Sequence, residues 1–189
     1  MSDAEADLIN RARRGDEAAW GALVGAHQDA IFRLAYLLLG DADAAADVAQ
    51  EAFVRAFHAL DRVDPTRPLR PWLLRITANV ARNQQRAVGR YWAAVRRWIA
   101  AAPPPVTTLG ERTAQEWEAH TLWQAVRRLR PAEQEVVYLR YFLDLSEAEM
   151  TGVLEVPPGT VKSRLHRAIG RLRTVVDQEF PALREERQL

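Results

Sequence analysis

Apolar residues recur at helical spacing through almost the whole chain of 189 residues. Between residues 16 and 39 they lie mainly three and four positions apart, which predicts one amphipathic helix. Its predicted inward residues are Trp20, Leu23, Val24, Ile31, Leu34, Ala35 and Leu38. Asp16 suits the N-cap, and Gly40 suits the C-terminal stop. No useful length of chain alternates as a strand would, so the pattern predicts an all-α fold.

Two more helices follow in the first half of the chain. One is capped by Asp41 or Asp43 and ends near Leu60. Its predicted inward residues are Val48, Ala49, Ala52, Phe53, Ala56 and Phe57. A loop with two prolines occupies residues 61–70, and Pro71 then starts a helix from Trp72 to about Gln85.

The pattern changes between residues 87 and 110. Pro103-Pro104-Pro105 favours an extended spacer, so this segment separates two small helical domains. The predicted divisions are a first domain at 1–88, a linker at 89–111, a second domain at 112–178 and a tail at 179–189. Four apolar residues just before the spacer share a helical face, which either packs on one of the domains or binds a partner. They are Trp92, Val95, Trp98 and Ile99.

The second domain begins with two predicted helices, at about 111–128 and 132–142. Their apolar residues are Trp117, Leu122, Trp123, Val126 and Leu129 in the first helix, and Val136, Val137, Leu139, Tyr141 and Phe142 in the second. A short helix over 146–154 comes next, where Ser146 and Glu149 form a capping-box pattern. Glu155-Val156-Pro157 breaks it before a longer helix starts at Pro158, which predicts a helix-turn-helix.

This last helix has a basic surface. Its apolar stripe is Val161, Leu165, Ala168, Ile169 and Leu172, and no Asp or Glu occurs between Pro157 and Arg173. The other positions carry Thr160, Lys162, Ser163, Arg164, His166, Arg167, Arg171 and Arg173. The helix is either an ordinary solvated helix or one that faces an anionic partner. Lys162, Ser163, His166 and Arg167 project near the N-terminal end, which a helix-turn-helix inserts into the major groove of DNA.

Composition narrows the class of protein. The net charge is only +1, but it is segregated: acidic residues crowd the first half, whereas residues 82–97 and the basic helix carry arginines without acids. Cysteine is absent, which excludes disulfides and thiolate metal sites within the chain. Neither a signal peptide nor a membrane span is apparent, so a cytoplasmic protein is expected. The four histidines are scattered and no phosphate loop occurs, so we expect no enzyme, metal or cofactor.

The second domain resembles region 4 of the extracytoplasmic-function (ECF) sigma factors, the small promoter-specificity subunits of bacterial RNA polymerase. The resemblance rests on Leu129–Val137, Leu145–Met150 and above all the block Gly159–Ala168. It implies a region 4-like four-helix domain whose contacts to the −35 element come from Thr160, Lys162, Ser163, Arg164, His166, Arg167 and Arg171. Pro158 replaces a usual small aliphatic residue. Glu155 replaces a common turn glycine, so the turn is either strained or needs no positive φ.

Residues 41–57 resemble region 2.2 of the same family, whose helix docks on the clamp helices of the polymerase β′ subunit. The implied contacts are Asp43, Asp47, Gln50, Glu51 and Val54, and Phe57 stands where Trp is common. The three acids are four residues apart and repel one another slightly, which suits a basic partner. From spacing alone, an ordinary solvated acidic face is the favoured interpretation, and the resemblance is what points to a polymerase contact.

Residues 71–83 resemble regions 2.3 and 2.4, which read and melt the −10 element. The implied contacts are Trp72, Asn79, Arg82, Asn83 and Arg86. Asn offers a donor and an acceptor to a base edge, Arg binds phosphate, and aromatic rings stack bases, as melted DNA requires. Trp72 is either a core anchor or a strand contact. The 65–70 loop lies at the position of the family's specificity loop for a flipped base.

The resemblance covers about residues 16–88 and 115–176, and predicts a region 2-like bundle and a region 4-like domain joined by a linker. It implies a sigma factor that binds core RNA polymerase through the β′ clamp helices and the β flap. It also implies contact with duplex promoter DNA and the non-template strand, and control by an anti-sigma protein. The alternative is a helix-turn-helix regulator that binds duplex DNA only, which leaves residues 72–86 and the acidic face unexplained.

Overall fold

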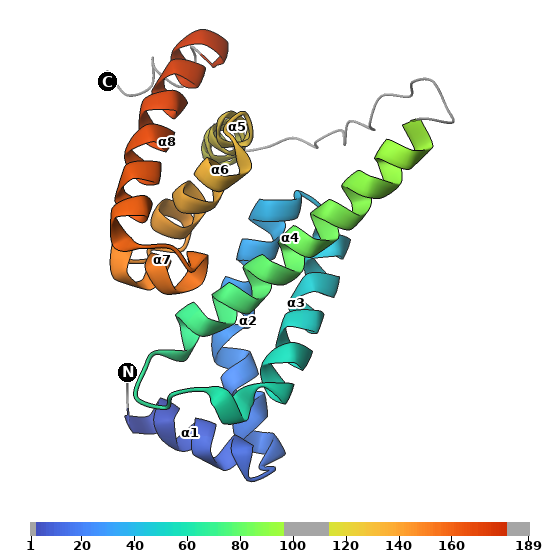
Figure 1. Ribbon diagram of the computed structural model, residues 1–189, viewed down its shortest axis with the longest axis vertical. Helices are drawn as coiled ribbons and strands as arrows, with labels where there is room; N and C mark the ends of the chain where they lie inside the picture. Colours follow the sequence, from blue (N-terminus) through green and yellow to red (C-terminus); the bar gives the residue numbers. More distant parts are fainter. Residues whose placement is uncertain (1–2, 97–113, 181–189) are drawn as a thin grey trace.

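The computed structural model describes residues 3–96 and 114–180. These residues form eight α-helices, a 3₁₀ turn and a π-helical turn, and none of them lies in a strand. The first domain contains α1 (Asp3–Arg13), α2 (Glu17–Leu39), α3 (Ala42–His58), η1 (Leu60–Arg62) and α4 (Leu69–Arg96). The second contains α5 (Ala114–Arg127), α6 (Pro131–Val137), η2 (Tyr138–Phe142), α7 (Glu147–Leu154) and α8 (Pro158–Glu179). The all-α prediction is confirmed (Figure 1).

The caps predicted around α2 are present. The Asp16 carboxylate accepts a hydrogen bond from the Ala19 amide at 3.0 Å. Gly40 ends the helix with φ of 74°, and its N–H donates to the Tyr36 carbonyl at 2.7 Å. A glycine adopts this left-handed conformation without the steric cost of a Cβ. The next helix is capped by Asp41 rather than Asp43, because Asp41 accepts from the Ala44 amide at 2.8 Å.

Helix α1 was not predicted from the sequence pattern, and it closes the lower end of the bundle of α2, α3 and α4 in Figure 1. Ile9 is fully buried there, in a core that includes Leu23, Ile31 and Leu73. The Arg13 guanidinium donates to the Leu60 carbonyl at 3.1 Å and also to the Val63 carbonyl. These bonds tie α1 to the loop that precedes α4.

Helix α4 is longer than predicted. It begins at Leu69 instead of Trp72 and continues past the predicted end at Gln85 to Arg96, so the first residues of the predicted linker are helical. No proline occurs between Gln85 and Arg96, and the single glycine there costs only about 1 kcal/mol. Residues 97–113 lie outside the described part of the chain. The side chains of the Trp92–Ile99 face are not described either, so both interpretations of that face stay predictions.

The predicted inward face of α3 is correct except at Phe57. Val48, Ala52 and Ala56 are buried, whereas the Phe57 side chain is 48% exposed. Its ring lies 5.3 Å from the Trp20 ring, centroid to centroid, at the surface of the bundle. Phe57 therefore belongs to the surface beside the acidic residues of α3 rather than to the core.

A π-helical turn changes the inward face of the helix after α6. The Leu143 amide donates to the Tyr138 carbonyl at 3.1 Å, five residues back, and this wider turn rotates the side chains that follow. Tyr138 is fully buried and burial raises the pKa of its hydroxyl to about 12. Tyr141, one of the apolar residues of the predicted helix, is 60% exposed.

The helix-turn-helix forms as predicted. Glu149 closes the capping box, because its amide donates to the Ser146 hydroxyl at 3.3 Å and its carboxylate accepts from the Ser146 amide at 2.8 Å. Glu155 then adopts φ of 54°, in the left-handed region. The turn therefore does require a positive φ, and the first of the two alternatives for Glu155 is correct. Pro158 occupies the first turn of α8.

We expect glycine at position 155 to give a more stable protein than alanine at the same position. Glu155→Gly removes about 1 kcal/mol of left-handed strain and loses an exposed ion pair with Arg75, worth at most about 1 kcal/mol. Glu155→Ala loses the same ion pair and keeps the strain. Chemical denaturation should therefore give a free energy of unfolding about 1 kcal/mol higher for the Gly variant than for the Ala variant. Equal values for the two would show that the turn is unstrained.

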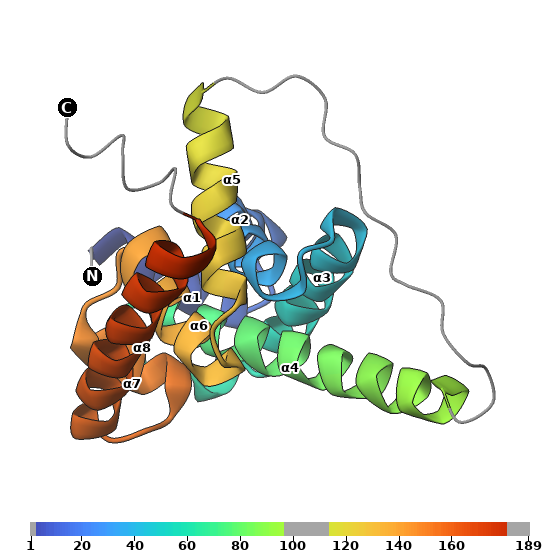
Figure 2. The same cartoon turned by 90° about the horizontal axis from the view of Figure 1, so that it is seen from above.

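The two domains pack against each other. One buried apolar cluster includes Leu74 and Ala78 of α4 together with Val136 of α6 and Met150 of α7. The Tyr36 ring of α2 stacks on the Trp123 ring of α5, with centroids 6.0 Å apart and planes inclined by 12°. Figures 1 and 2 show α7 beside the start of α4, and α3 on the side of the first domain away from α7 and α8.

Candidate functional site

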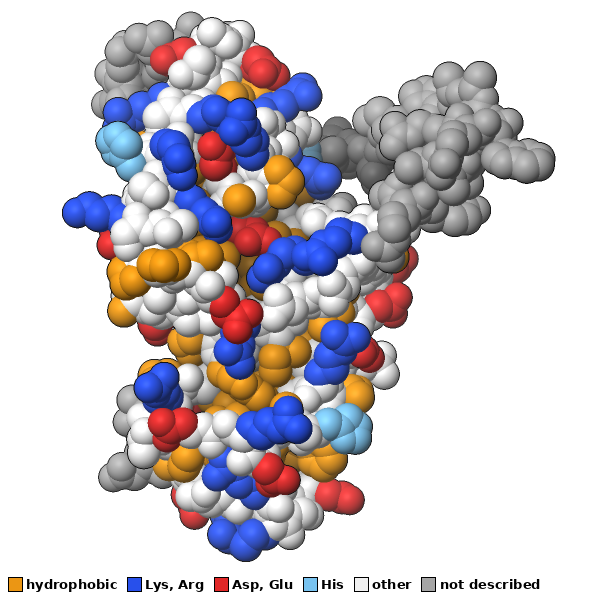
Figure 3. Space-filling model, viewed as in Figure 1, with side chains coloured by type: hydrophobic (Ala, Val, Ile, Leu, Met, Phe, Trp, Pro, Cys, Tyr) orange, Lys and Arg blue, Asp and Glu red, His pale blue; other side chains and the backbone are white. Residues whose placement is uncertain are grey.

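The N-terminal half of α8 presents a basic surface. Lys162, Ser163, His166 and Arg167 are all exposed, whereas Val161 and Ala168 are buried against the domain. The turn at Glu155 and the short helix α7 hold α8 in this orientation. In Figure 3, Lys and Arg side chains gather over α8 and along α4. This arrangement places four hydrogen-bonding side chains where a helix-turn-helix meets the major groove.

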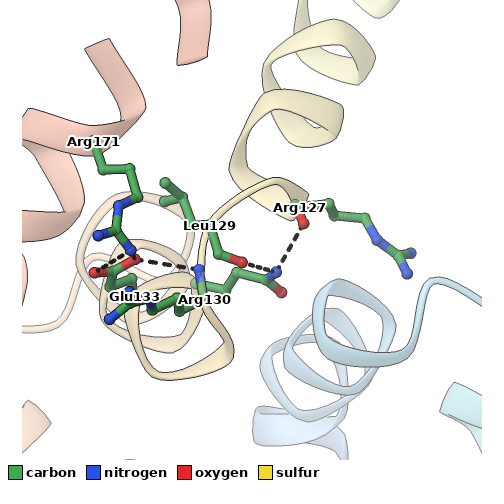
Figure 4. Close-up of polar contacts among 6 residues, drawn as sticks. Arg127, Leu129, Arg130, Glu133 and Arg171 are labelled. Atoms are coloured by element: carbon green, nitrogen blue, oxygen red, sulfur yellow. Dashed lines mark hydrogen bonds and ion pairs between the residues drawn. The ribbon is translucent and has the colours of Figure 1, made fainter. Parts of the chain in front are cut away.

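The other three predicted residues of this surface are half-buried. Arg171 donates to both carboxylate oxygens of Glu133 in α6, at 3.1 and 2.9 Å, as Figure 4 shows. The same carboxylate accepts from the Arg130 amide at 3.2 Å. Arg171 thus fastens α8 to the start of α6. Thr160 and Arg164 lie on the sides of the helix, and whether all three residues contact DNA stays a prediction.

A second polar surface lies along α4. Asn83 and Arg86 are exposed, and Asn79 is half-buried on the same side. Arg82 has a different environment, because its Nε lies 3.2 Å from a Glu135 carboxylate oxygen of the second domain. Its Nε also lies 3.2 Å from the Ala78 carbonyl. The residues predicted to contact single-stranded DNA therefore lie on one helix, but the guanidinium of Arg82 contacts Glu135 of the second domain.

Trp72 borders a cavity of about 460 Å³ at the start of α4. Its walls include Arg62, Arg67 and Arg75 from the first domain. The loop beside it is ordered locally: Asp64 accepts hydrogen bonds from the Thr66 hydroxyl at 2.6 Å and the Thr66 amide at 2.9 Å, and these lower the pKa of the Asp64 carboxyl. Trp72 is half-buried, which suits an aromatic wall for a base as well as a packing role.

The acidic surface of α3 is exposed to solvent. Its five predicted residues, Asp43, Asp47, Gln50, Glu51 and Val54, are all exposed. Glu51 accepts a hydrogen bond from the Arg55 guanidinium at 2.7 Å. We therefore expect the Asp47 carboxylate to be more available to a partner than that of Glu51. A groove of about 810 Å³ lies alongside, lined by Trp20, Gln50, Phe53, Val54 and Phe57 among others. The surface thus combines carboxylates with an apolar groove, which sequence reasoning missed.

Sequence reasoning missed three further residues, Arg75, Glu135 and Glu155. Arg75 lies four positions before Asn79, so the spacing rule that selected Asn79 and Asn83 would have included it. Arg75 Nη1 is 3.2 Å from a Glu155 carboxylate oxygen. Nothing in the sequence signalled the ion pairs of Glu135 and Glu155, because glutamates are usually solvated.

The described residues provide no group of three or more potential metal-ligating His, Asp or Glu side chains. Within the same ranges, none of the helices combines the length and the apolar character that crossing a bilayer requires.

Both halves of the chain match the models of known protein families. The family models Sigma-70 region 2 and Sigma-70, region 4 match residues 23–91 and 119–172. The ECF RNA polymerase sigma factor SigW of Bacillus subtilis is 31% identical over 177 residues, which cover 87% of this chain and 92% of SigW.

Two solved structures resemble the fold. CnrH, in complex with the cytosolic domain of CnrY, aligns with a TM-score of 0.72 and 29% identity over 94% of this chain and 99% of CnrH. The sigma factor RpoE from Bartonella quintana, in complex with the anti-sigma factor NepR, aligns with a TM-score of 0.66 over 84% of this chain and 97% of RpoE. At 22% identity, the second likeness concerns the fold alone. The matched domains and the identity along nearly the whole length together show that the chain belongs to the extracytoplasmic-function family of RNA polymerase sigma factors.

Proposed function

We propose that the two domains of this sigma factor divide the work of promoter recognition. The first domain, residues 1–88 together with the continuation of α4 to Arg96, docks on core polymerase through α3 and holds the melted −10 strand on α4. The second domain, residues 112–178, places α8 in the major groove of the −35 element. Two weak contacts joined by one linker gain effective concentration, so neither needs high affinity alone. In this role the chain directs initiation and catalyses no reaction of its own.

The observation that carries this proposal is the pairing of two separate DNA-compatible surfaces in one chain. The exposed Lys162, Ser163, His166 and Arg167 suit duplex readout, whereas Asn83 and Arg86 suit a single strand. A regulator that binds only duplex DNA has no use for the second surface or for the acidic surface of α3. Transcription from a promoter-bearing template by core polymerase with and without the protein tests the proposal, since a regulator cannot replace a sigma factor.

We also propose two protein partners besides the β′ clamp helices. The β flap suits the second domain, where a groove of about 500 Å³ between α5 and α8 is lined by Leu122, Tyr141, Ile169, Leu172 and Val176 among others. An anti-sigma protein is the second partner, because the structural relatives CnrH and RpoE were solved with CnrY and NepR. The chain is controlled from outside in this scheme, since it has no cysteine for a thiol switch.

Reversing the charge of Asp47 should weaken binding to core polymerase. Asp47→Lys places a cation where α3 meets the basic partner surface, and lost attraction plus new repulsion should reduce affinity by about 1–3 kcal/mol. Fluorescence titration of labelled protein with core polymerase measures the effect. Asp29→Lys, an equal charge reversal on the exposed side of α2, is the matched control. If both variants bind core polymerase equally well, α3 is not the docking surface.

A further inference from the structure

Helix α1 holds both ends of the loop that joins η1 to α4, and it lies under this loop in Figure 1. At the start of the loop, the Arg13 guanidinium donates to the Leu60 carbonyl at 3.1 Å and also to the Val63 carbonyl. At its end, the Leu69 amide donates to a Glu5 carboxylate oxygen at 3.4 Å. Arg13 and Glu5 lie about two turns apart on α1. One short helix therefore sets where the loop begins and where it ends.

Buried side chains reinforce these hydrogen bonds. Leu60, Val63 and Leu69, which flank or open the loop, belong to the same apolar cluster as Ile9 of α1. None of the four is more than 7% exposed. Displacing the loop from α1 would expose apolar surface in addition to breaking hydrogen bonds to a charged donor, and both changes are unfavourable.

Glu5 also acts on the N-terminus of α4. Leu69 is the first residue of that helix, so its N–H is one of the donors that an α-helix leaves without an intrahelical partner. A carboxylate at this end accepts the hydrogen bond and interacts favourably with the helix dipole. His27 of α2 lies beside it, with its Nε2 3.3 Å from the other Glu5 oxygen. Glu5 thus joins α1, α2 and the start of α4.

The loop forms part of the wall of the cavity at Trp72. Asp64, Arg67 and Pro68 of the loop line this cavity of about 460 Å³. A cavity of this size is within the usual range for a small planar ligand such as a nucleobase. A shift of the loop would therefore change the shape of the cavity and the positions of its polar groups, while the exposed residues of α3 and α8 stay where they are.

We propose that α1 is a positioning element for base selection at the −10 element, in which Arg13 and Glu5 hold the loop where it can read a base that enters the Trp72 cavity. The inference rests on the proposed function of α4. Neither Arg13 nor Glu5 is among the residues that line the cavity, so both act through the loop. The matched Sigma-70 region 2 model begins at residue 23, so this contribution comes from a helix outside the matched segment.

Arg13→Ala is tested in the holoenzyme, on a promoter that wild-type protein transcribes and on its single-base variants in the −10 element. The preference for the best base at one position, measured as a ratio of rates of open-complex formation, should fall by about three- to tenfold, because a displaced wall loses part of the discrimination that a base contact gives. Arg13→Lys keeps a cation that can donate to a carbonyl and should restore part of the preference. Arg14→Ala removes the same charge from an exposed neighbour and should leave the preference unchanged.

A change that only destabilises the protein gives a different result. Leu129→Val, at a buried position between α5 and α6, should lower all the rates alike and leave their ratios unchanged. Glu5→Ala, which removes the other attachment of the loop, should relax the preference as Arg13→Ala does. Asp7→Ala removes the same charge from an exposed position of α1 and is its matched control.

The position of the loop is measured without polymerase by electron–electron distance spectroscopy. The chain has no cysteine, so spin labels at Arg67→Cys in the loop and Ala46→Cys on α3, both exposed positions, are specific. The labelled protein should give one narrow distance. Adding Arg13→Ala should broaden or shift that distribution, whereas adding Arg14→Ala should not.

The proposal is overturned if Arg13→Ala keeps both the wild-type base preference and the wild-type distance distribution. A loop that moves without any change in preference does not select the base, and a changed preference with an unmoved loop means that Arg13 acts on DNA itself; either result also overturns it. If the wild-type holoenzyme initiates no transcription, the proposed function fails instead, and the distances in the free protein still show whether Arg13 holds the loop.

Discussion

Arg167→Ala should weaken binding of the holoenzyme to its −35 element by about 1–3 kcal/mol and relax sequence preference at one base pair. Arg167 is exposed in the N-terminal half of α8, and its guanidinium can donate two parallel hydrogen bonds to a guanine edge. Loss of a bidentate contact changes both affinity and preference, whereas loss of a phosphate contact weakens all sequences alike. Competition binding on a library randomised at the −35 element separates the two effects.

Three changes at other positions of α8 make that experiment specific. Lys162→Ala should weaken binding to every sequence and flatten the dependence on salt, as expected for a phosphate contact. Arg173→Ala removes the same charge from an exposed position outside the predicted set. Arg171→Ala should instead lower stability, because it breaks the ion pair with Glu133 that holds α8 to α6. If Arg167→Ala behaves like Arg173→Ala, α8 does not dock in the predicted pose.

The second large effect is expected at the −10 element. Asn83→Ala combined with Arg86→Ala should reduce open-complex formation by about ten- to hundredfold, because both exposed side chains contact the melted strand in our proposal. Binding to core polymerase and to duplex −35 DNA should be unchanged. On a template with a pre-melted bubble the defect should be smaller, because part of the DNA is already unpaired and less free energy is needed to melt it.

Permanganate footprinting of the promoter measures the open complex on both templates. Arg14→Ala, an exposed arginine in the turn after α1, is the control for lost positive charge. An equal defect on both templates would assign these residues to holding the strand rather than to opening it. A defect in binding to core polymerase would mean that α4 contributes to docking instead.

Local signals in the sequence located most of the fold. Asp16, Gly40 and Ser146 each have the capping role that their residue types predict, because these caps depend on groups within a few residues. The basic helix could also be predicted, because its charge pattern and its start at Pro158 are properties of one short segment. The five acidic-surface residues of α3 were all found on the exposed side for the same reason.

The features that the sequence did not predict depend on distant parts of the chain. Helix α1 has few apolar residues, and Ile9 is buried only because the rest of the bundle covers it. The π-helical turn at Tyr138–Phe142, in which Tyr138 is buried and Tyr141 is exposed, has no local signal. The pairs of Arg75 with Glu155 and of Arg82 with Glu135 are set by how the two domains meet, and helical periodicity carries no information about that.

Run-off transcription with purified core polymerase on a library of promoter fragments tests the central claim most directly. If the chain is a sigma factor of the proposed kind, core polymerase alone should give no specific transcripts. Addition of the protein should then give transcripts from a subset of fragments that share a −35 and a −10 sequence at fixed spacing. Binding of the protein to the same fragments without any polymerase-dependent transcript would contradict the account and favour a duplex-binding regulator.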